Sequence, residues 1–189
     1  MHARLFLRAR SCVFACLLLC GQAAGAPAVD VRVEHVDTDG ERVYQVNARG
    51  DVAAAPAAVW RILTDYDRMA EFVPGLRSAR VLARSGDQAI VEQHGVAQFL
   101  FLRRPIRLLV QVREQPISQI DISLIDGDML VYNCIWRMIP VPETGGTRIV
   151  YSGALAPKFY VPAMFGPSLI RADIANMMAA VLARLDRPG

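Results

Sequence analysis

A long amphipathic helix is predicted at the C-terminal end of the chain, over residues 167–186. Apolar residues there recur at spacings of three and four, which puts them on one helix face; they are Ile170, Ile174, Met177, Met178, Val181 and Leu185. Pro167 suits the first helical turn, and Pro188 follows the last periodic residue. No second helical pattern of this length lies between residue 27 and this helix, so the stripe must pack against something other than a helix.

The chain before this helix is dominated by strand patterns. Alternating apolar and polar positions predict a hairpin over 30–36 and 42–52, with its turn at Asp37-Thr38-Asp39-Gly40. Further strand-like runs are 78–83, 88–94, 96–102, 106–114, 119–125, 129–139 and 148–156. Breaks are expected between them, for example at Gly95 and at Arg103-Arg104-Pro105. Connections this short join antiparallel strands, because parallel strands need long crossovers.

Two short helices are predicted between the hairpin and these runs, over Pro56–Leu63 and 68–72. Residues that share the apolar face of the run at 129–139 are Leu130, Tyr132, Cys134, Trp136 and Met138. One apolar and one wetter face per strand is typical of a sheet covered on one side only. The predicted fold class is therefore α+β: a curved antiparallel β-sheet of about seven strands with two short helices and a long C-terminal α-helix across it.

The first 26 residues have the pattern of a secretory signal peptide. Arg4, Arg8 and Arg10 form a basic start, followed by a short apolar run over 11–20 and then by small residues. The run is too short to span a bilayer, although an uncleaved anchor and a lipidated Cys20 stay open as alternatives. We therefore expect a protein that is periplasmic or otherwise exported, with a single domain over residues 29–189.

Removing this segment changes the charge balance and the cysteine content. The whole chain has 21 basic and 18 acidic residues, and loss of three arginines leaves 18 of each. A neutral domain without a Lys/Arg cluster argues against nucleic-acid binding. Cys134 is the one cysteine that remains, so an intramolecular disulfide cannot form and the core must stabilise the fold.

The order of these elements resembles the helix-grip fold of the START-like (SRPBCC) superfamily, and more closely its polyketide cyclase/dehydrase and coenzyme Q-binding protein branch. The similar stretches are 52–60, 63–67, 72–76, Trp136, Gly146-Thr147-Arg148 and Tyr151. The resemblance spans about residues 44–186. It implies a cavity between sheet and helix that holds a hydrophobic small molecule. Binders, carriers and enzymes share this fold, so the fold alone does not choose among them.

Motifs for catalysis and metal binding find no support in the sequence. His35 and His94 are the histidines after the signal segment, and neither belongs to an HExxH pattern; CxxC and GxSxG patterns are also missing. The predicted inward faces carry almost no ionisable groups apart from tyrosine. We therefore expect no metal site, no cofactor and no catalytic residues, which weighs against an enzyme.

Candidate ligand contacts are the large apolar and aromatic residues predicted near the space between helix and sheet: Trp60, Phe72, Tyr132, Trp136, Tyr151, Phe159, Met164, Phe165, Ile174, Met177 and Met178. Each of them also fits ordinary core packing, and both interpretations stay open. Tyr132 and Tyr151 could orient a ligand's polar group through their hydroxyls. The segment 158–167 suits either a cavity mouth or a surface connection.

The expected function is that of an exported binding or carrier protein for a lipid, an isoprenoid quinone or a polyketide-like molecule. Two alternatives stay open: a cyclase or dehydratase that uses the same cavity, and a protein-interaction module whose cavity is filled. A hydrophobic small molecule or lipid is the expected partner, and the chain is expected to be a monomer. Transient contact with a membrane surface stays open.

Overall fold

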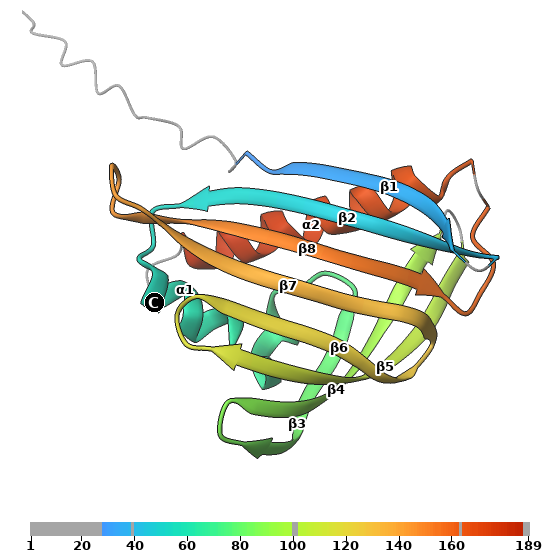
Figure 1. The fold of residues 1–189 in the computed structure, drawn as a ribbon, viewed down its shortest axis with the longest axis horizontal. Coiled ribbons are helices and arrows are strands. Elements are labelled where there is room, and N and C mark those ends of the chain that lie inside the picture. Colours follow the sequence, from blue (N-terminus) through green and yellow to red (C-terminus); the bar gives the residue numbers. More distant parts are fainter. Residues whose placement is uncertain (1–27, 39, 100–101, 163, 187–189) are drawn as a thin grey trace, which may run out of the picture.

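The computed structural model describes residues 28–38, 40–99, 102–162 and 164–186. Its elements follow one another as β1 Asp30–Thr38, β2 Glu41–Val52, α1 Pro56–Leu63, the 3-10 helix η1 Tyr66–Glu71, β3 Leu76–Ser85, β4 Gln88–Phe99, β5 Leu102–Gln115, β6 Gln119–Gly127, β7 Met129–Val141, β8 Gly146–Pro157 and α2 Gly166–Leu185. Figure 1 shows the strands as one sheet with α2 running behind β2 and β8. The α+β helix-grip fold is confirmed.

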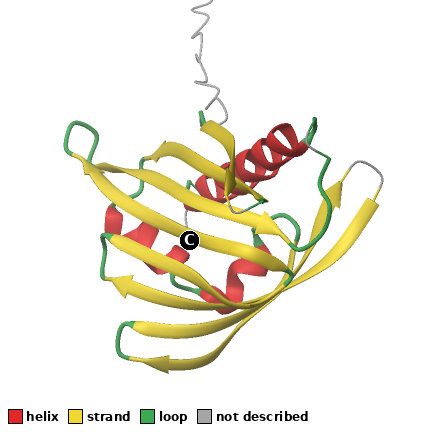
Figure 2. Ribbon diagram, turned by 45° about the vertical axis from the view of Figure 1, so that its right-hand side comes forward, coloured by secondary structure: helices red, strands yellow, loops and turns green. Residues whose placement is uncertain are grey.

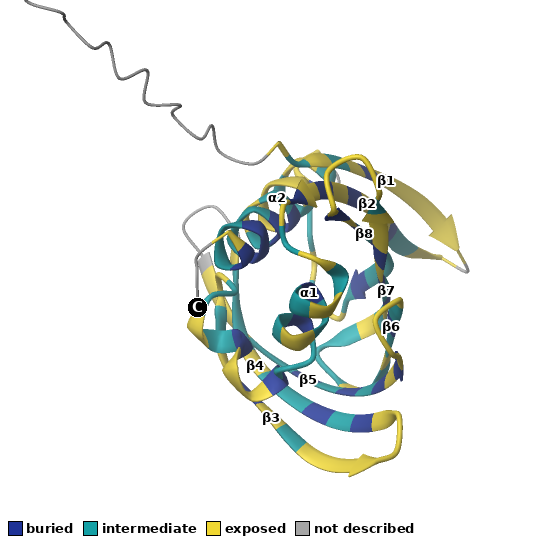
Figure 3. Ribbon diagram, turned by 90° about the vertical axis from the view of Figure 1, so that its left-hand side faces the viewer, coloured by how far each residue is buried: buried dark blue, intermediate teal, exposed yellow. Residues whose placement is uncertain are grey.

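All neighbouring strands of the sheet are antiparallel, in the order β1-β2-β8-β7-β6-β5-β4-β3. The sheet joins distant parts of the chain where β2 pairs with β8, from Tyr44 opposite Leu155 to Val52 opposite Thr147. Figure 2 shows the helices on one side of this sheet. Figure 3, along the long axis, shows the sheet curving around α1, with α2 beside β1 and β2.

The predicted long helix is confirmed to within one residue at each end. Its packed side is broader than the sequence stripe, because Leu182 is fully buried together with Met178 and Val181. A β-carbon at Gly50 of β2 would lie only 2.6 Å from Leu182 Cδ1. Glycine at this position therefore lets the helix approach the strand closely.

Two predicted breaks between strands are wrong. The strand β4 continues through Gly95, and β5 includes Arg103-Arg104-Pro105. Gly95 pairs with Ile106 on one side and with Leu76 on the other, and a β-carbon there would lie 3.0 Å from the Gly75 carbonyl oxygen. Gly95 thus serves a close approach between backbones and does not form a turn.

The predicted inward face of β7 is largely confirmed, since Cys134, Trp136 and Met138 are buried. Leu130 is the exception, with 45% of its surface exposed. A register shift between Met129 and Val131 in the pairing with β8 breaks the alternation of faces. The alternation rule therefore fails at the first residues of the strand and holds after them.

Candidate ligand-binding cavity

A cavity of about 450 Å³ lies between α2 and the inner face of the sheet. Its wall comes from η1 and the loop that follows, from the strands β3 to β8, from the segment before α2, and from α2 itself. The wall is mostly apolar, and its volume is within the range of about 300–1,000 Å³ typical of small-molecule sites. The geometry therefore fits a hydrophobic ligand of modest size.

The outer rim of the cavity is formed by those lining residues that are exposed to solvent: Pro74, Gly75, Gln98, Asp173 and Asn176. They come from the loop after η1, from β4 and from α2. Since β3 pairs with β4 only as far as Gly95, the next residues of β4 have no strand beside them on that side. The part of the rim formed by the loop after η1 and by β4 is thus separated from the part formed by α2.

The inner wall is built by alternate residues of β7 and β8. Trp136 and Tyr151 pack edge to face with ring centroids 5.0 Å apart, and both line the cavity. The Tyr151 ring lies along its own strand because Gly153 has no side chain; a β-carbon there would lie 3.2 Å from the Tyr151 hydroxyl. This glycine therefore makes room for an aromatic ring with a polar end.

Tyr132, Cys134 and Tyr151 form a small polar cluster in this wall. Burial raises the pKa of the Cys134 thiol to about 12, and the neighbouring tyrosine hydroxyls oppose that effect. The Cys134 sulfur and burial raise the pKa of Tyr132, and burial is the main cause of the raised pKa of Tyr151. All three groups are therefore protonated at neutral pH. Among the residues described, both hydroxyls have the Cys134 thiol as their side-chain hydrogen-bond partner, and a thiol is a weak donor and a weak acceptor.

Asp173 is a polar lining residue that the sequence stripe placed off the apolar face of α2. It is exposed on its outer side, yet its partial burial beside the apolar rim raises the pKa of its carboxyl group. No ion pair with Asp173 occurs among the residues that the structure describes. A single carboxyl group therefore stands at the mouth of an apolar cavity.

The eleven candidate ligand contacts separate into two groups. Six line the cavity: Tyr132, Trp136, Tyr151, Phe159, Ile174 and Met177. Met178, one residue further along α2, is fully buried on the other side of the helix, and Trp60 and Phe72 pack against the core without lining the cavity. Met164 and Phe165 are exposed just before α2.

Sequence reasoning missed the part of the wall formed by η1, by the loop after it, and by β3 and β4. Met69, Val73 and Leu76 face α2 across the cavity, together with Gln93 and Val96. Alternation along β4 could have marked some of these residues as inward. The opposition of this loop to α2 is a tertiary arrangement and leaves no local pattern.

A second polar cluster lies in the core but not in the cavity wall. The Tyr66 hydroxyl donates a hydrogen bond of 2.9 Å to Glu114 Oε1, and Arg84 Nη1 donates one of 3.0 Å to the same oxygen. Glu114 is buried on the inner face of β5. The expectation that inward faces carry almost no ionisable groups is therefore wrong at this position, where two donors compensate the buried charge.

Other kinds of site are not apparent in the described residues. They contain no group of three or more His, Cys, Asp or Glu side chains that could hold a metal ion. None of the helices described is both long and apolar enough to cross a membrane.

Residues 52–182 match the protein family described as polyketide cyclase/dehydrase and lipid transport. The chain belongs to this family. No curated protein matches the sequence.

Solved structures share the fold at low sequence identity. A START superfamily protein from Mycobacterium smegmatis is 19% identical with a TM-score of 0.65, covering 75% of this chain and 96% of its own. A STAR-related lipid transfer protein from Xanthomonas axonopodis is 12% identical with a TM-score of 0.63, covering 82% and 99%. The Zhui aromatase/cyclase from Streptomyces sp. R1128 is 16% identical with a TM-score of 0.61, covering 77% and 94%. The START-like fold is thus shared by a lipid transfer protein and an enzyme.

Proposed function

We propose that this protein is an exported carrier that holds a hydrophobic small molecule, such as a lipid, an isoprenoid quinone or a polyketide-like compound. The observation that carries the proposal is the apolar cavity of about 450 Å³ between α2 and the sheet. Membership of a family that includes lipid transport supports it. A cavity of this volume also disfavours the alternative of an interaction module with a filled interior.

Native mass spectrometry tests the binding proposal directly. The protein is purified from its native host without detergent, and bound lipid is extracted and identified. We expect a mass excess from a co-purified apolar compound. A Met177→Trp variant, in which a lining side chain is enlarged, should carry none. An unloaded native protein that also takes up no hydrophobic compound added in vitro would contradict the carrier function.

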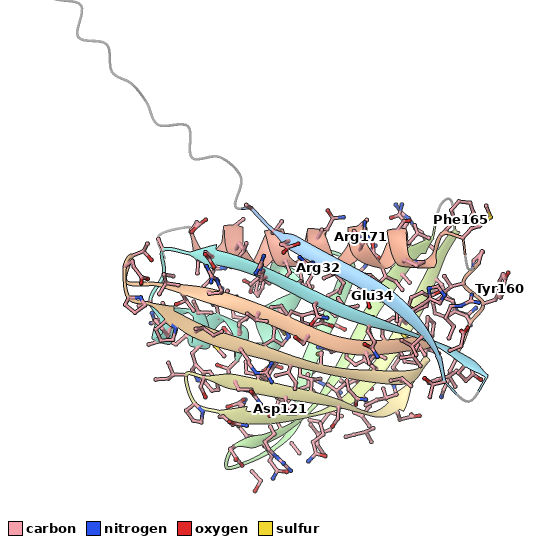
Figure 4. All side chains as sticks on the ribbon, turned by 45° about the horizontal axis from the view of Figure 1, so that its top comes forward. Arg32, Glu34, Asp121, Tyr160, Phe165 and Arg171 are labelled. Atoms are coloured by element: carbon pink, nitrogen blue, oxygen red, sulfur yellow. The ribbon has the colours of Figure 1, made fainter. Side chains whose placement is uncertain are left out.

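Contact with a membrane surface is part of the same proposal, because a carrier must collect and deliver its ligand. Tyr160 and Met164, just before α2, are 84% and 82% exposed. Figure 4 shows Tyr160 and Phe165 at the same end of the molecule. Lys158 and Arg104 are exposed nearby, and the Arg104 guanidinium lies 4.8 Å from the centre of the Phe159 ring. Apolar tips flanked by cations suit a weak, reversible contact with anionic lipid.

The proposal of export is based on the sequence pattern of residues 1–26, which lie outside the described part of the structure. Protein taken from the envelope fraction of the native host should begin between Ala24 and Val29. Sequencing its N-terminus checks this. An intact Met1 on the mature protein would contradict cleavage of a signal peptide.

A cyclase or dehydratase is the second candidate function. The single observation in its favour is Asp173, a carboxyl group with a raised pKa at the cavity rim, as a general acid or base requires. If Asp173 acts in this way, Asp173→Asn should abolish turnover of a polyketide-like substrate without weakening its binding. Binding without any turnover by the unmodified protein would leave the carrier function alone.

A further inference from the structure

The charges around the cavity are distributed unevenly. Among the described residues that line it, Asp173 is the one with a charged side chain, and none is Lys or Arg. Arg104 stacks on the lining residue Phe159 and is not itself part of the wall. An anionic head group entering this space would meet a carboxylate at the rim and no cation inside.

Hydrogen-bond donors lie instead in the inner wall. Tyr132 and Tyr151 line the cavity, and within the described part of the chain the Cys134 thiol is the side-chain hydrogen-bond partner of both hydroxyls. Burial keeps both hydroxyls protonated, so each can donate a hydrogen bond to a ligand. The rest of the inner wall, which includes Trp136, Leu108 and Ile122, is mostly apolar, and its polar residue Gln93 carries a neutral amide. A neutral acceptor group, such as a carbonyl oxygen, would be satisfied there, whereas a carboxylate would lose its hydration without gaining a counter-ion.

We propose that the cavity selects neutral lipids that carry a hydrogen-bond acceptor, holds this acceptor against the Tyr132 and Tyr151 hydroxyls, and rejects anionic lipids at Asp173. The inference rests on the proposed carrier function and adds the chemical class of the ligand and its orientation. The polar end lies inside, and the apolar chain extends between α2 and β4 toward the rim.

A matched set of probes with similar chain length tests this selection. Methyl hexadecanoate carries a neutral acceptor, hexadecanoate at pH 8 carries a charge, and octadecane carries neither. Each competes with Nile red, a neutral dye whose fluorescence reports the apolar cavity. We expect the ester to compete at least about tenfold more strongly than the carboxylate, since an unpaired buried charge is costly. The ester should also exceed the alkane by roughly two- to tenfold.

Single substitutions test which side chains cause the preference for the ester. Tyr132→Phe and Tyr151→Phe remove the hydroxyls and should reduce the preference for the ester over the alkane, while alkane competition stays the same. Asp173→Asn should strengthen competition by hexadecanoate by several-fold. Asp186→Asn, which removes an exposed carboxylate just beyond the other end of α2, is the matched control and should leave the preference unchanged.

The outcomes separate this inference from the carrier function. If hexadecanoate competes as well as the ester, and Arg104→Ala removes that competition, an anion is held at the rim and the inference is wrong while the carrier function stands. If the tyrosine variants weaken ester and alkane equally, the proposed orientation is wrong. If Nile red and all three probes fail to bind the unmodified protein, the carrier function itself is contradicted.

Discussion

The two sides of α2 meet very different surroundings, although both are apolar. One side, with Met178 and Leu182, packs on β1 and β2 so closely that Gly50 has no room for a side chain. The other side, with Ile170, Asp173 and Met177, faces the cavity. Hydrophobic periodicity places residues on a helix face but does not say whether that face meets side chains or empty space. The curvature of the sheet decides this.

The largest effect should come from truncation on the packed side. Leu182→Ala should lower the free energy of unfolding by about 2–5 kcal/mol, because the surrounding structure cannot close the gap. Ile170→Ala, on the cavity side, should cost less, since part of this side chain already borders free space. Urea unfolding measures both variants. Equal losses would show that the two sides of α2 are packed alike.

Replacing each of the consecutive residues Met177 and Met178 by tryptophan should distinguish the cavity side of α2 from its packed side. Met178→Trp should cost about 1–3 kcal/mol, because Met178 is fully buried and does not line the cavity. Met177→Trp should leave thermal stability nearly unchanged and block the uptake of an isoprenoid quinone, because Met177 lines the cavity. The contrast fails if Met177→Trp destabilises the fold as strongly as Met178→Trp does.

The two polar clusters, around Glu114 and around Cys134, should also differ in how much a tyrosine hydroxyl contributes to stability, although by less. Tyr66→Phe removes a hydrogen bond to the buried Glu114 carboxylate and should cost about 1.5 kcal/mol. Tyr151→Phe should cost less, because the Tyr151 hydroxyl has only a thiol beside it. Thermal unfolding of both variants, with Tyr160→Phe as an exposed control, checks this order. A more damaging Tyr151→Phe would indicate that its hydroxyl has a structural role.

Truncation of the buried Cys134 side chain should have only a small effect on stability. Its inward, buried position agrees with the sequence prediction, and Cys134→Ala should cost about 1 kcal/mol. Because burial raises the pKa of the thiol to about 12, a polar thiol reagent should label the folded protein slowly at pH 8. An unfolded chain loses this proton near the ordinary pKa of 9.0, so the thiol weakens the folded state progressively between pH 9 and about 12. Rapid labelling at pH 8 would show that solvent reaches Cys134.

The sequence predicts the elements better than it predicts the cavity. The limits of α1 and α2 follow from periodicity and proline positions, and the buried face of β7 follows from alternation. The sequence does not predict that Met177 lines the cavity while Met178 packs in the core, because both belong to the same apolar stripe. Asp173 does not belong to the apolar stripe, and periodicity alone does not show what a residue beside the stripe faces. Its place at the rim depends on the loop after η1 and on β4, which approach α2 only in the folded molecule.

The pairing of β2 with β8 has a consequence for the order of events during synthesis. Tyr44 finds its partner Leu155 only after more than half of the chain has followed it, and α2, which covers β1 and β2, comes last of all. Long-range pairing of this kind slows folding, because the entropy cost of closing a large loop arises before the stabilising contacts have formed. The complete sheet therefore cannot form before β8 has been synthesised. An export pathway that threads unfolded chains through a membrane would find this chain ready for transport.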